Sequence, residues 1–515
     1  MKKSIQLIVV GSIMAVSSVT FVACNKTINE TQKSAYTPAS LDEKAGTWKT
    51  YVLASPTEIA VAEPKAINSA EYLAEVASLK QKSSSLTSAQ QDAVTYWGAG
   101  AAFRWNEIGR ELCARYNIPP ASTPDGKYPV PDAANPLADP RFPFANPPYT
   151  SRALAYLSVA QYDALVSAWH YKYLYNRVAP AKTDATLKPL LPVTTLPSYP
   201  SEDAVVAAAS VVILKAMFPG EVAFLDAKLA EHRNSRLWAG MNVESDLVAG
   251  ETLGSAVAAK VMGRAKTDGM SAANNQTVTA GMIQAAKERG LKEVWVSQET
   301  PARPPMLPNF GAVKPWNLET GTLAKVRPPA PPDLASDAYK KDLAELSQIN
   351  KGQTRDQARV ANFWADGPGS YTPPGHWHRT AANTAHDALF SEVRMARTLA
   401  LVGTTEMDAG IACWDAKYYY YFPRPQQFGM KTSVGLPNFP SYPSGHSTFS
   451  GAAATVLSYI FPDKAQVFET EASEASLSRV YGLIHYRFDA EKGIDHGKVI
   501  GSYAVARGKA DGSGL

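Results

Sequence analysis

The C-terminal third of the chain carries residues whose types and spacing suit the binding of a small, highly charged anion. Lys417 precedes Arg424 by seven positions, so the two cations lie near the end of an expected helix and in the turn that follows. Pro-Ser-Gly-His at 443–446 comes directly before another expected helix. There the hydroxyl of Ser444 and the backbone amide of Gly445 can donate hydrogen bonds to an anion, and the helix dipole adds to the attraction.

A third motif adds a guanidinium, an imidazole and a carboxylate. Arg479 precedes His485 by six positions, and Asp489 follows His485 by four, which would place the last two on one face of a helix. Bringing Arg479 to the same place requires a bend or the full reach of its side chain. A guanidinium can bind two oxygens at once, and each charge-assisted hydrogen bond contributes about 1.5–3 kcal/mol. With His446 of the second motif, the set predicts a site for a tetrahedral oxyanion such as phosphate or vanadate.

An earlier part of the chain repeats this region at a nearly constant offset. Residues 163–180 align with 408–425 at an offset of 245, and Pro-Ser-Tyr-Pro-Ser at 197–201 recurs 243 positions later. The residues needed for packing and turns are common to both copies, but the earlier copy lacks one guanidinium, two imidazoles and a glycine of the later one. Opposite Arg424, Gly445, His446 and His485, the earlier copy has Ala179, Glu202, Asp203 and Asn242. The comparison predicts an internal duplication in which only the later copy keeps a site.

Helical periodicity and proline breaks organise the rest of the sequence. Stretches rich in small residues and bounded by proline, such as 204–217 and 447–460, are typical of packed helices, and strand-like alternation is scarce. We expect an all-α protein of two pseudo-symmetric halves, each a bundle of about four helices. The predicted regions are a signal peptide (1–24), a tether (25–54), a first, degenerate half (55–275), a proline-rich linker (276–335) and a second, catalytic half (336–515).

The N-terminus and the overall charge bear on location and partners. Two lysines, an apolar stretch and a small residue before Cys24 resemble a bacterial lipoprotein signal, with an uncleaved anchor helix as the alternative. We expect Cys24 to be lipidated and the protein to be exported and held at a membrane surface, on the periplasmic or cell-surface side. No later apolar run is long enough to span a membrane. A net charge of +4 on 515 residues argues against a nucleic-acid partner.

Two other groups of residues have a structural interpretation. Cys113 and Cys413 lie in apolar, helix-like contexts, which favours two buried thiols over a disulfide. His376 and His378 form a His-x-His pair that could bind a metal, but a surface loop is the better interpretation of this short pattern. Neither group therefore adds to the predicted site.

The motifs Lys-x6-Arg-Pro, Pro-Ser-Gly-His and Ser-Arg-x5-His-x3-Asp, in this order, resemble the signature of the superfamily that joins vanadium-dependent haloperoxidases to type 2 phosphatidic acid phosphatases. The resemblance covers the second half closely and implies a fold of two four-helix bundles. It also implies a role for each residue. The oxyanion would be held by Lys417, Arg424, Ser444, Gly445 and Arg479; His485 would ligate vanadium or attack phosphorus; His446 would be the general acid–base; Asp489 would orient its surroundings; and Asp366 would be the acidic partner of Arg479.

Two activities share such a site, and neighbouring residues bear on the choice. With bound vanadate the enzyme would oxidise a halide with hydrogen peroxide; without it, His485 would attack a phosphate monoester. Trp414 and Phe439 resemble aromatic residues on the halide side of haloperoxidases, which favours the oxidative activity, although Trp169 stands opposite Trp414. An acid phosphatase is the alternative, and a non-catalytic surface lipoprotein is a third hypothesis. The sequence leaves the halide, the organic acceptor and the oligomeric state open.

Overall fold

Capping side chains decide where the longest helices of this chain begin. Asn146 accepts a hydrogen bond from the amide of Tyr149 at the start of one, and Ser391 accepts one from the amide of Arg394 at the start of the other. The computed structural model describes residues 31–132, 135, 137–139, 141–319 and 321–514. Every regular element in these residues is helical, so the prediction of an all-α fold is confirmed.

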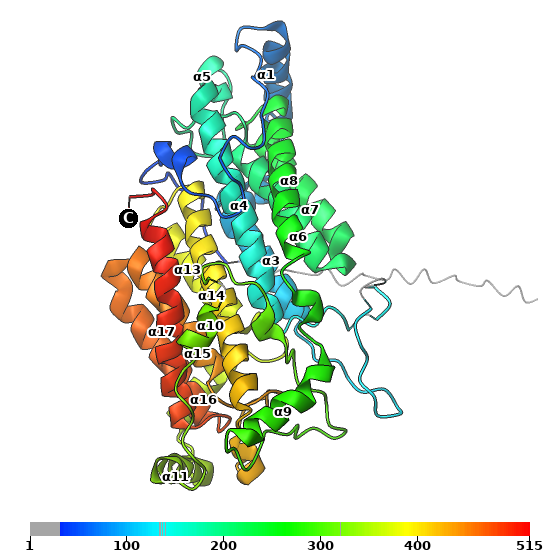
Figure 1. Cartoon of the computed structure of the whole chain (residues 1–515). Coiled ribbons are helices and arrows are strands. Elements are labelled where there is room, and N and C mark those ends of the chain that lie inside the picture. The colour runs from blue at the N-terminus through cyan, green and yellow to red at the C-terminus, as the bar shows by residue number, and fades with distance from the viewer. Residues whose placement is uncertain (1–30, 133–134, 136, 140, 320, 515) are drawn as a thin grey trace, which may run out of the picture. The chain divides into compact units, whose positions relative to one another are not determined.

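The helices follow one another along the chain in the blue-to-red order of Figure 1. They are α1 (Ala70–Lys82), α2 (Ser88–Gly98), α3 (Ala101–Tyr116), α4 (Pro147–Tyr175), α5 (Pro180–Thr183), α6 (Glu202–Met217), α7 (Val222–Trp238), α8 (Glu244–Ala265), α9 (Thr279–Glu288), α10 (Thr322–Val326), α11 (Asp337–Lys351), α12 (Arg355–Phe363), α13 (Thr372–Asp387), α14 (Glu392–Tyr420), α15 (Gly445–Ile460), α16 (Ala465–Tyr481) and α17 (Arg487–Lys509), with the 3-10 turns η1 (Glu43–Thr47), η2 (Pro219–Glu221), η3 (Met270–Ala272), η4 (Gln276–Val278), η5 (Phe310–Ala312), η6 (Pro425–Phe428) and η7 (Pro462–Lys464).

The two longest helices, α4 and α14, pack against each other along the core (Figure 1). Each has 29 residues, and most side chains around the full circumference of each are buried. A helix that is enclosed on all sides needs no polar face, which explains why neither sequence alternates between polar and apolar faces. Both helices end at a residue in the left-handed conformation, Asn176 at φ 50° and Tyr421 at φ 52°.

Each long helix belongs to a bundle of four. In the first half α4 packs against α6 and α8, and α7 packs against α6; in the second half α14 packs against α15 and α17, and α16 packs against α15. Helices α6 and α15 both have 16 residues, and α7 and α16 both have 17. The starts of α6, α7 and α8 each precede their counterparts by 243 positions. The elements therefore follow the offset seen in the sequence, while the duplication itself stays a prediction.

Glycines let two pairs of helices approach closely at equivalent positions. A Cβ at Gly254 of α8 would clash with the carbonyl oxygen of Val205 on α6. A Cβ at Gly497 of α17 would clash in the same way with the carbonyl oxygen of Thr448 on α15. Only glycine lacks this atom, so Gly254 sets how closely α8 approaches α6, and Gly497 sets how closely α17 approaches α15. Helices α15 and α17 carry predicted site residues.

The predicted tether (25–54) is wrong for its described part, because residues from 33 onward pack on the helices. Asp42 forms an ion pair with Arg394, and the amide of Lys49 donates to the carbonyl of Asp511 at 2.8 Å. The amides at 51–53 donate to the carboxylate of Asp163 in α4. These contacts use backbone amides, which composition does not reveal. Cys24 and the signal peptide lie outside the described residues, and their assignments stay predictions.

The proline-rich stretch (276–335) is also more than a linker. It contains α9, η5 and α10, and the amides of Trp316 and Asn317 donate to the carboxylate of Asp408 in α14 at 2.6 and 2.7 Å. Asp408 therefore holds this segment just as Asp163 holds the N-terminal one. From Gln32 onward the chain packs as one compact unit, so the predicted boundaries inside it do not separate independent bodies.

The remaining expectations concern single residues. Cys113 and Cys413 are both free and buried, as predicted. His376 and His378 do not lie in a surface loop: both are buried within α13, which begins before the two prolines at 373–374. In the part of the chain that the structure describes, none of the helices combines the length and apolarity needed to cross a membrane.

Candidate active site

The predicted site residues lie at the ends of four helices of the second half. Lys417 is in the last turn of α14, Ser444 caps α15, and Arg479 is in the last turn of α16. His485 lies in the short break between α16 and α17, and Asp489 is in the first turn of α17. The expectation that His485 and Asp489 share a helix is therefore wrong in detail. The break between α16 and α17 supplies the bend that the spacing from Arg479 to His485 required.

His485 is oriented by two oxygen groups. Its Nδ1 lies 2.9 Å from Oδ2 of Asp489 and 3.3 Å from Oγ of Ser441. Ser441 also donates to the same carboxylate oxygen at 2.5 Å. Because Nδ1 faces a carboxylate, its proton is held there and the lone pair is left on Nε2. Burial, then the charges of Arg424 and Lys417, lower the pKa of His485 well below its usual value, so the imidazole is neutral at pH 7.

Ser441 was not among the predicted site residues. It lies in Pro-Ser-Tyr-Pro-Ser, and its counterpart Ser198 is kept in the first half, where it contacts Asp246 at 3.2 Å. A comparison that searches for lost residues passes over one that both copies retain. The type and spacing of Ser441 gave no signal for it. The structure shows that the serine of each half contacts the aspartate of the same half.

Lys417 is fully buried beneath the turn that precedes α15. Its Nζ donates to three carbonyl oxygens, those of Pro440, Ser441 and Pro443, at 2.9, 2.7 and 2.5 Å. Burial, with the nearby charge of Arg424, lowers the pKa of Lys417 to about 7. A cation this strongly desolvated is stabilised by any anion that approaches it.

Arg424 is held on one side and left unpaired on the other. Its Nε donates to the carbonyl of Phe439 at 2.8 Å, and Nη1 donates to that of Ile484 at 2.7 Å. Its Nη2 is buried and has no partner among the described residues. Burial lowers the pKa of Arg424 to about 9. An unpaired guanidinium nitrogen of this kind costs free energy unless an acceptor meets it.

Arg479 completes the set of cations. Its Nε donates to Oγ of Ser478, and Nη2 donates to the carbonyl of Ala361, both at 2.8 Å. Burial lowers its pKa to about 10, and the charge of Asp366 opposes this shift. The carboxylate of Asp366 itself contacts His376, at 3.3 Å from Nδ1. Asp366, predicted as the partner of Arg479, therefore influences Arg479 through its charge. Its contact is with the imidazole of His376.

His446 and Gly445 form the start of α15. Nε2 of His446 is buried and has no partner among the described residues. Burial, then the charge of Arg479, lowers the pKa of His446 well below its usual value. A Cβ at Gly445 would point between the ring of Trp414 and Cε of Lys417, at 3.8 and 4.0 Å. The missing side chain keeps the space in front of the lysine open.

Trp414 and Phe439 form an aromatic wall beside the cations. Their ring centroids are 4.9 Å apart. Nζ of Lys417 and the guanidinium carbon of Arg424 lie 5.1 and 5.0 Å from the centroid of the Phe439 ring, which is within the range of cation–π attraction. The indole nitrogen of Trp414 donates to the carbonyl of Met306 at 3.2 Å. The proline-rich stretch therefore fixes one side of this wall.

These groups suit a tetrahedral oxyanion. Arg424 donates to the carbonyl of Ile484, the neighbour of His485, and the charges of Arg424, Lys417 and Arg479 all lower the pKa of His485. Of the two predicted site carboxylates, Asp366 acts on Arg479 through its charge, and Asp489 has its pKa raised to about 7 by burial. The site therefore has buried positive charge, two neutral imidazoles, an unpaired donor at Nη2 of Arg424 and an unpaired nitrogen at Nε2 of His446. A small anion of high charge would accept from the unpaired nitrogen of Arg424 and offset the buried positive charge.

The comparisons with known proteins agree with this geometry. Residues 395–507 match the sequence model of the PAP2 superfamily. All the oxyanion-site residues from Lys417 to Asp489 lie in this segment, so the resemblance inferred from the motifs is confirmed there. None of the curated proteins matches the chain.

Among solved structures, the chain is similar to a bacterial vanadium-dependent iodoperoxidase, with a TM-score of 0.52 and 23% identity over 70% of this chain and 91% of that one. It is also similar to holo and apo forms of a bacterial vanadium-dependent chloroperoxidase, each with a TM-score of 0.49. Identity to these is 14% over 75% of this chain and 97% of that one, and 15% over 71% and 93%. The likeness to the iodoperoxidase shows that the helical fold is shared.

Proposed function

We propose that this protein is a haloperoxidase-like enzyme that oxidises a halide with hydrogen peroxide at a vanadate bound in the second half. The observation that carries the proposal is a set of three buried cations, one of them with an unpaired guanidinium nitrogen, together with a histidine whose Nδ1 is held by a carboxylate. Such a set binds an oxyanion and offers it one nitrogen ligand. The fold shared with a structure described as a vanadium-dependent iodoperoxidase supports the choice of vanadate.

Each residue has a part that follows from its contacts. Lys417, Arg424 and Arg479 would neutralise the oxyanion, with the hydroxyl of Ser444 and the amide of Gly445 as further donors. His485 would provide Nε2 as the metal ligand, because Nδ1 is bound to Asp489. Vanadate, when bound, would supply a Lewis acid that activates peroxide toward the halide.

His446 would move the protons of the reaction. Its depressed pKa leaves the imidazole neutral at pH 7, so Nε2 can accept a proton from hydrogen peroxide and return it to the product. The wall of Trp414 and Phe439 would keep bulk water away from Lys417 and give a polarisable halide an apolar surface. Both aromatic residues remain proposals for the halide side.

An acid phosphatase is the second candidate, and the same dyad favours it. A neutral His485 whose Nδ1 donates to Asp489 has its Nε2 lone pair free to attack phosphorus, with His446 positioned to protonate the leaving alcohol. The match to the PAP2 superfamily is compatible with this activity. Phosphate would then be the ligand of the site, and vanadate an inhibitor.

The two activities separate in a direct assay of the purified protein with and without orthovanadate. Peroxide-dependent iodination or bromination of a phenol dye is measured beside hydrolysis of an aryl phosphate. We expect halogenation that requires vanadate. Hydrolysis that vanadate inhibits, without halogenation, would instead establish the phosphatase, and neither activity would favour a non-catalytic binding protein.

The matched variants are His485→Ala and Asn242→Ala. We expect the first to abolish either activity, because it removes the nitrogen that ligates vanadium or attacks phosphorus. Asn242 occupies the equivalent position of the first half, where its amide donates to the carbonyl of Ser198 at 3.4 Å, and its removal should leave activity intact. Loss of activity in a folded Asn242→Ala protein would contradict the assignment of chemistry to the second half alone.

A further inference from the structure

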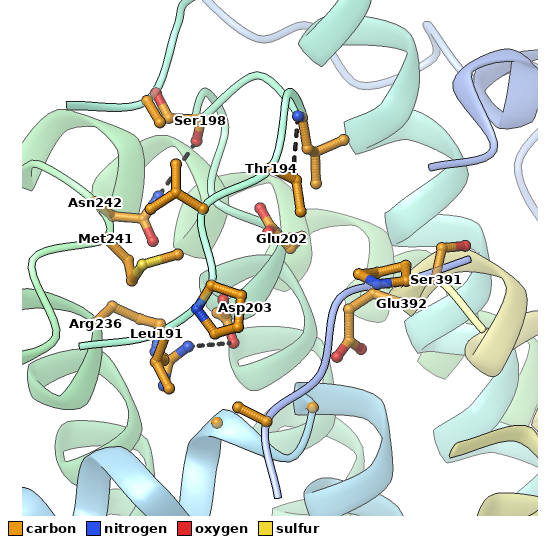
Figure 2. Close-up of a pocket in the computed structure, with 18 of the residues that line it drawn as sticks. Leu191, Thr194, Ser198, Glu202, Asp203, Arg236, Met241, Asn242, Ser391 and Glu392 are labelled. Atoms are coloured by element: carbon orange, nitrogen blue, oxygen red, sulfur yellow. Dashed lines mark hydrogen bonds and ion pairs between the residues drawn. The ribbon is translucent and has the colours of Figure 1, made fainter. Parts of the chain in front are cut away.

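A cavity of about 140 Å³ lies in the first half, built from the counterparts of the candidate active-site residues (Figure 2). Each of six lining residues stands opposite a residue of that site in the sequence repeat. These six are Trp169, Ala179, Glu202, Asp203, Arg236 and Asn242. A water molecule takes up about 30 Å³ of liquid volume, so a cavity of this size can admit a small anion.

Glu202, which lines this cavity, is already paired with a buried lysine. Nζ of Lys172, the counterpart of Lys417, forms an ion pair with the carboxylate of Glu202 at 2.7 Å. Glu202 stands where the second half has Gly445, and a side chain at that glycine would point toward the lysine. At this position the first half therefore has a carboxylate, and the second half has no side chain. Lys172 is 0% exposed, so this charge has no access to solvent.

The arginine of this cavity is paired in a similar way. Oδ1 of Asp203 lies 3.5 Å from Nη1 of Arg236 and 3.1 Å from Nε2 of His232, and Figure 2 shows the first of these contacts. Asp203 stands opposite His446, and Arg236 opposite Arg479. Arg236 is 4% exposed, and its Nη2 has no partner among the described residues. One donor of the cavity is thus still unpaired.

We propose that the first half contains a second oxyanion pocket, in which the carboxylates of Glu202 and Asp203 take the place of a tetrahedral anion such as phosphate. Two of the three cations that the second half uses are present in equivalent positions, with Ala179 opposite the third, and each of the two is paired with a carboxylate that the second half does not have. Removing the two negative charges would take from Lys172 and Arg236 the carboxylates that pair with them, which is strongly destabilising. Glu392, whose carboxylate accepts from the amides of Ala101 and Ala102, would be the acidic side chain still lining the cavity. An external phosphate can then replace the two lost negative charges.

The test is the paired substitution Glu202→Gln with Asp203→Asn in the full chain, which keeps the shape of both side chains. In phosphate-free buffer we expect a lower melting temperature than that of the wild type. Added inorganic phosphate should restore it, and equilibrium dialysis with radiolabelled phosphate should find one more phosphate per chain than in the wild type. Adding Arg236→Ala to the pair should remove that extra phosphate.

The control is Glu71→Gln with Asp92→Asn, which removes the same two charges from exposed positions of α1 and α2. Extra phosphate bound equally by this control, or none bound by the cavity variant, would overturn the proposal. If the paired variant does not fold, Glu202→Gly, which copies Gly445 and leaves Asp203 on Arg236, is tested in the same way. The inference does not rest on the proposed function, because the count is taken as a difference from the wild type.

Discussion

Ser441 is the residue through which the candidate active site can be tested most finely. Substituting it by alanine removes the hydrogen bond to Asp489 at 2.5 Å and the contact with Nδ1 of His485 at 3.3 Å. We expect activity to fall by about 10–100-fold, as is typical when a group that orients a ligating histidine is lost. Steady-state kinetics over a range of pH would measure the loss of activity. They would also measure any shift in the part of the pH–activity curve that reports the ionisation of His485 or Asp489.

The matched control for this substitution is Ser198→Ala in the first half. Ser198 makes the corresponding contact with Asp246 at 3.2 Å, so a loss of packing would be similar in both variants. We expect the control to keep its activity and its pH profile. Equal losses in the two variants would show that the serine supports the fold alone.

Lys417 gives the site an affinity for anions that depends on pH. Burial lowers the pKa of Lys417 to about 7 in the absence of an anion, and a bound anion raises it. Affinity is therefore greatest below pH 7 and falls as the pH rises through 7, where the free lysine loses its proton. Asp489, with a pKa raised to about 7 by burial, acquires a negative charge in the same range and adds to the fall.

Sulfate is the probe for this prediction, because its own charge is constant across the range. Calorimetric titration between pH 5 and 9 would measure the affinity of the wild type and of Lys417→Met. We expect weaker binding and a shallower pH dependence in the variant, with the remaining slope due to Asp489. An unchanged slope would show that Lys417 is not a group that titrates with binding.

At the residue scale, motif spacing singled out all three cations, and the first half marked Arg424, Gly445, His446 and His485 as residues that can be lost while the scaffold stays. It did not predict Ser441, which both halves retain, or the contact of Asp366 with His376, which joins α13 to the preceding loop. Residue type and spacing reveal charge. They do not reveal which of several nearby partners a carboxylate meets, since that depends on how helices pack.

At the element scale, Gly497 controls the distance between α15, which carries Ser444 to His446, and α17, which carries Asp489. In Gly497→Ala the added Cβ would clash with the carbonyl of Thr448, so the two helices must separate. We expect a loss of about 1–3 kcal/mol in the free energy of unfolding, typical of overpacking, together with reduced activity of the folded protein. Urea denaturation and the assay of activity would measure both.

Two glycines of α8 serve as controls for this substitution. Gly254→Ala places a Cβ against the carbonyl of Val205 in the first half, so we expect a similar loss of stability with activity retained. Gly263 has nothing within 4 Å of an added Cβ, and Gly263→Ala should stabilise the helix by about 0.5–1 kcal/mol. Retained activity in Gly497→Ala would mean that the site tolerates movement of α15 relative to α17.

The helices themselves were predictable because caps and prolines mark their ends, and small residues mark their contacts. The segments before α1 and between α8 and α11 were assigned wrongly, because polar and proline-rich composition is also typical of linkers. Their attachment depends on amides at 51–53 and 316–317 that donate to Asp163 and Asp408. Any residue except proline provides such an amide, so the side chains carry no signal for it.

At the scale of the whole molecule, the buried positive charge in the second half should make stability depend on the bound anion. An anion that binds the folded state only, at 100 times its dissociation constant, contributes about 2.7 kcal/mol. We expect phosphate or vanadate to raise the melting temperature of the wild type, as measured by scanning calorimetry. Arg424→Ala, which removes the guanidinium with an unpaired nitrogen, should show a smaller rise. The same rise in both proteins would place the anion elsewhere.

The contact of Lys49 with Asp511 joins the two ends of the described chain, and Asp42 with Arg394 joins its start to α14. During synthesis the N-terminal segment leaves the ribosome long before either partner exists, because the chain is made from its N-terminus. The carboxylate of Asp163, by contrast, follows its amides within the same half. The N-terminal segment therefore cannot complete its attachment until the residues around Asp511 have been made, however early its own residues appear.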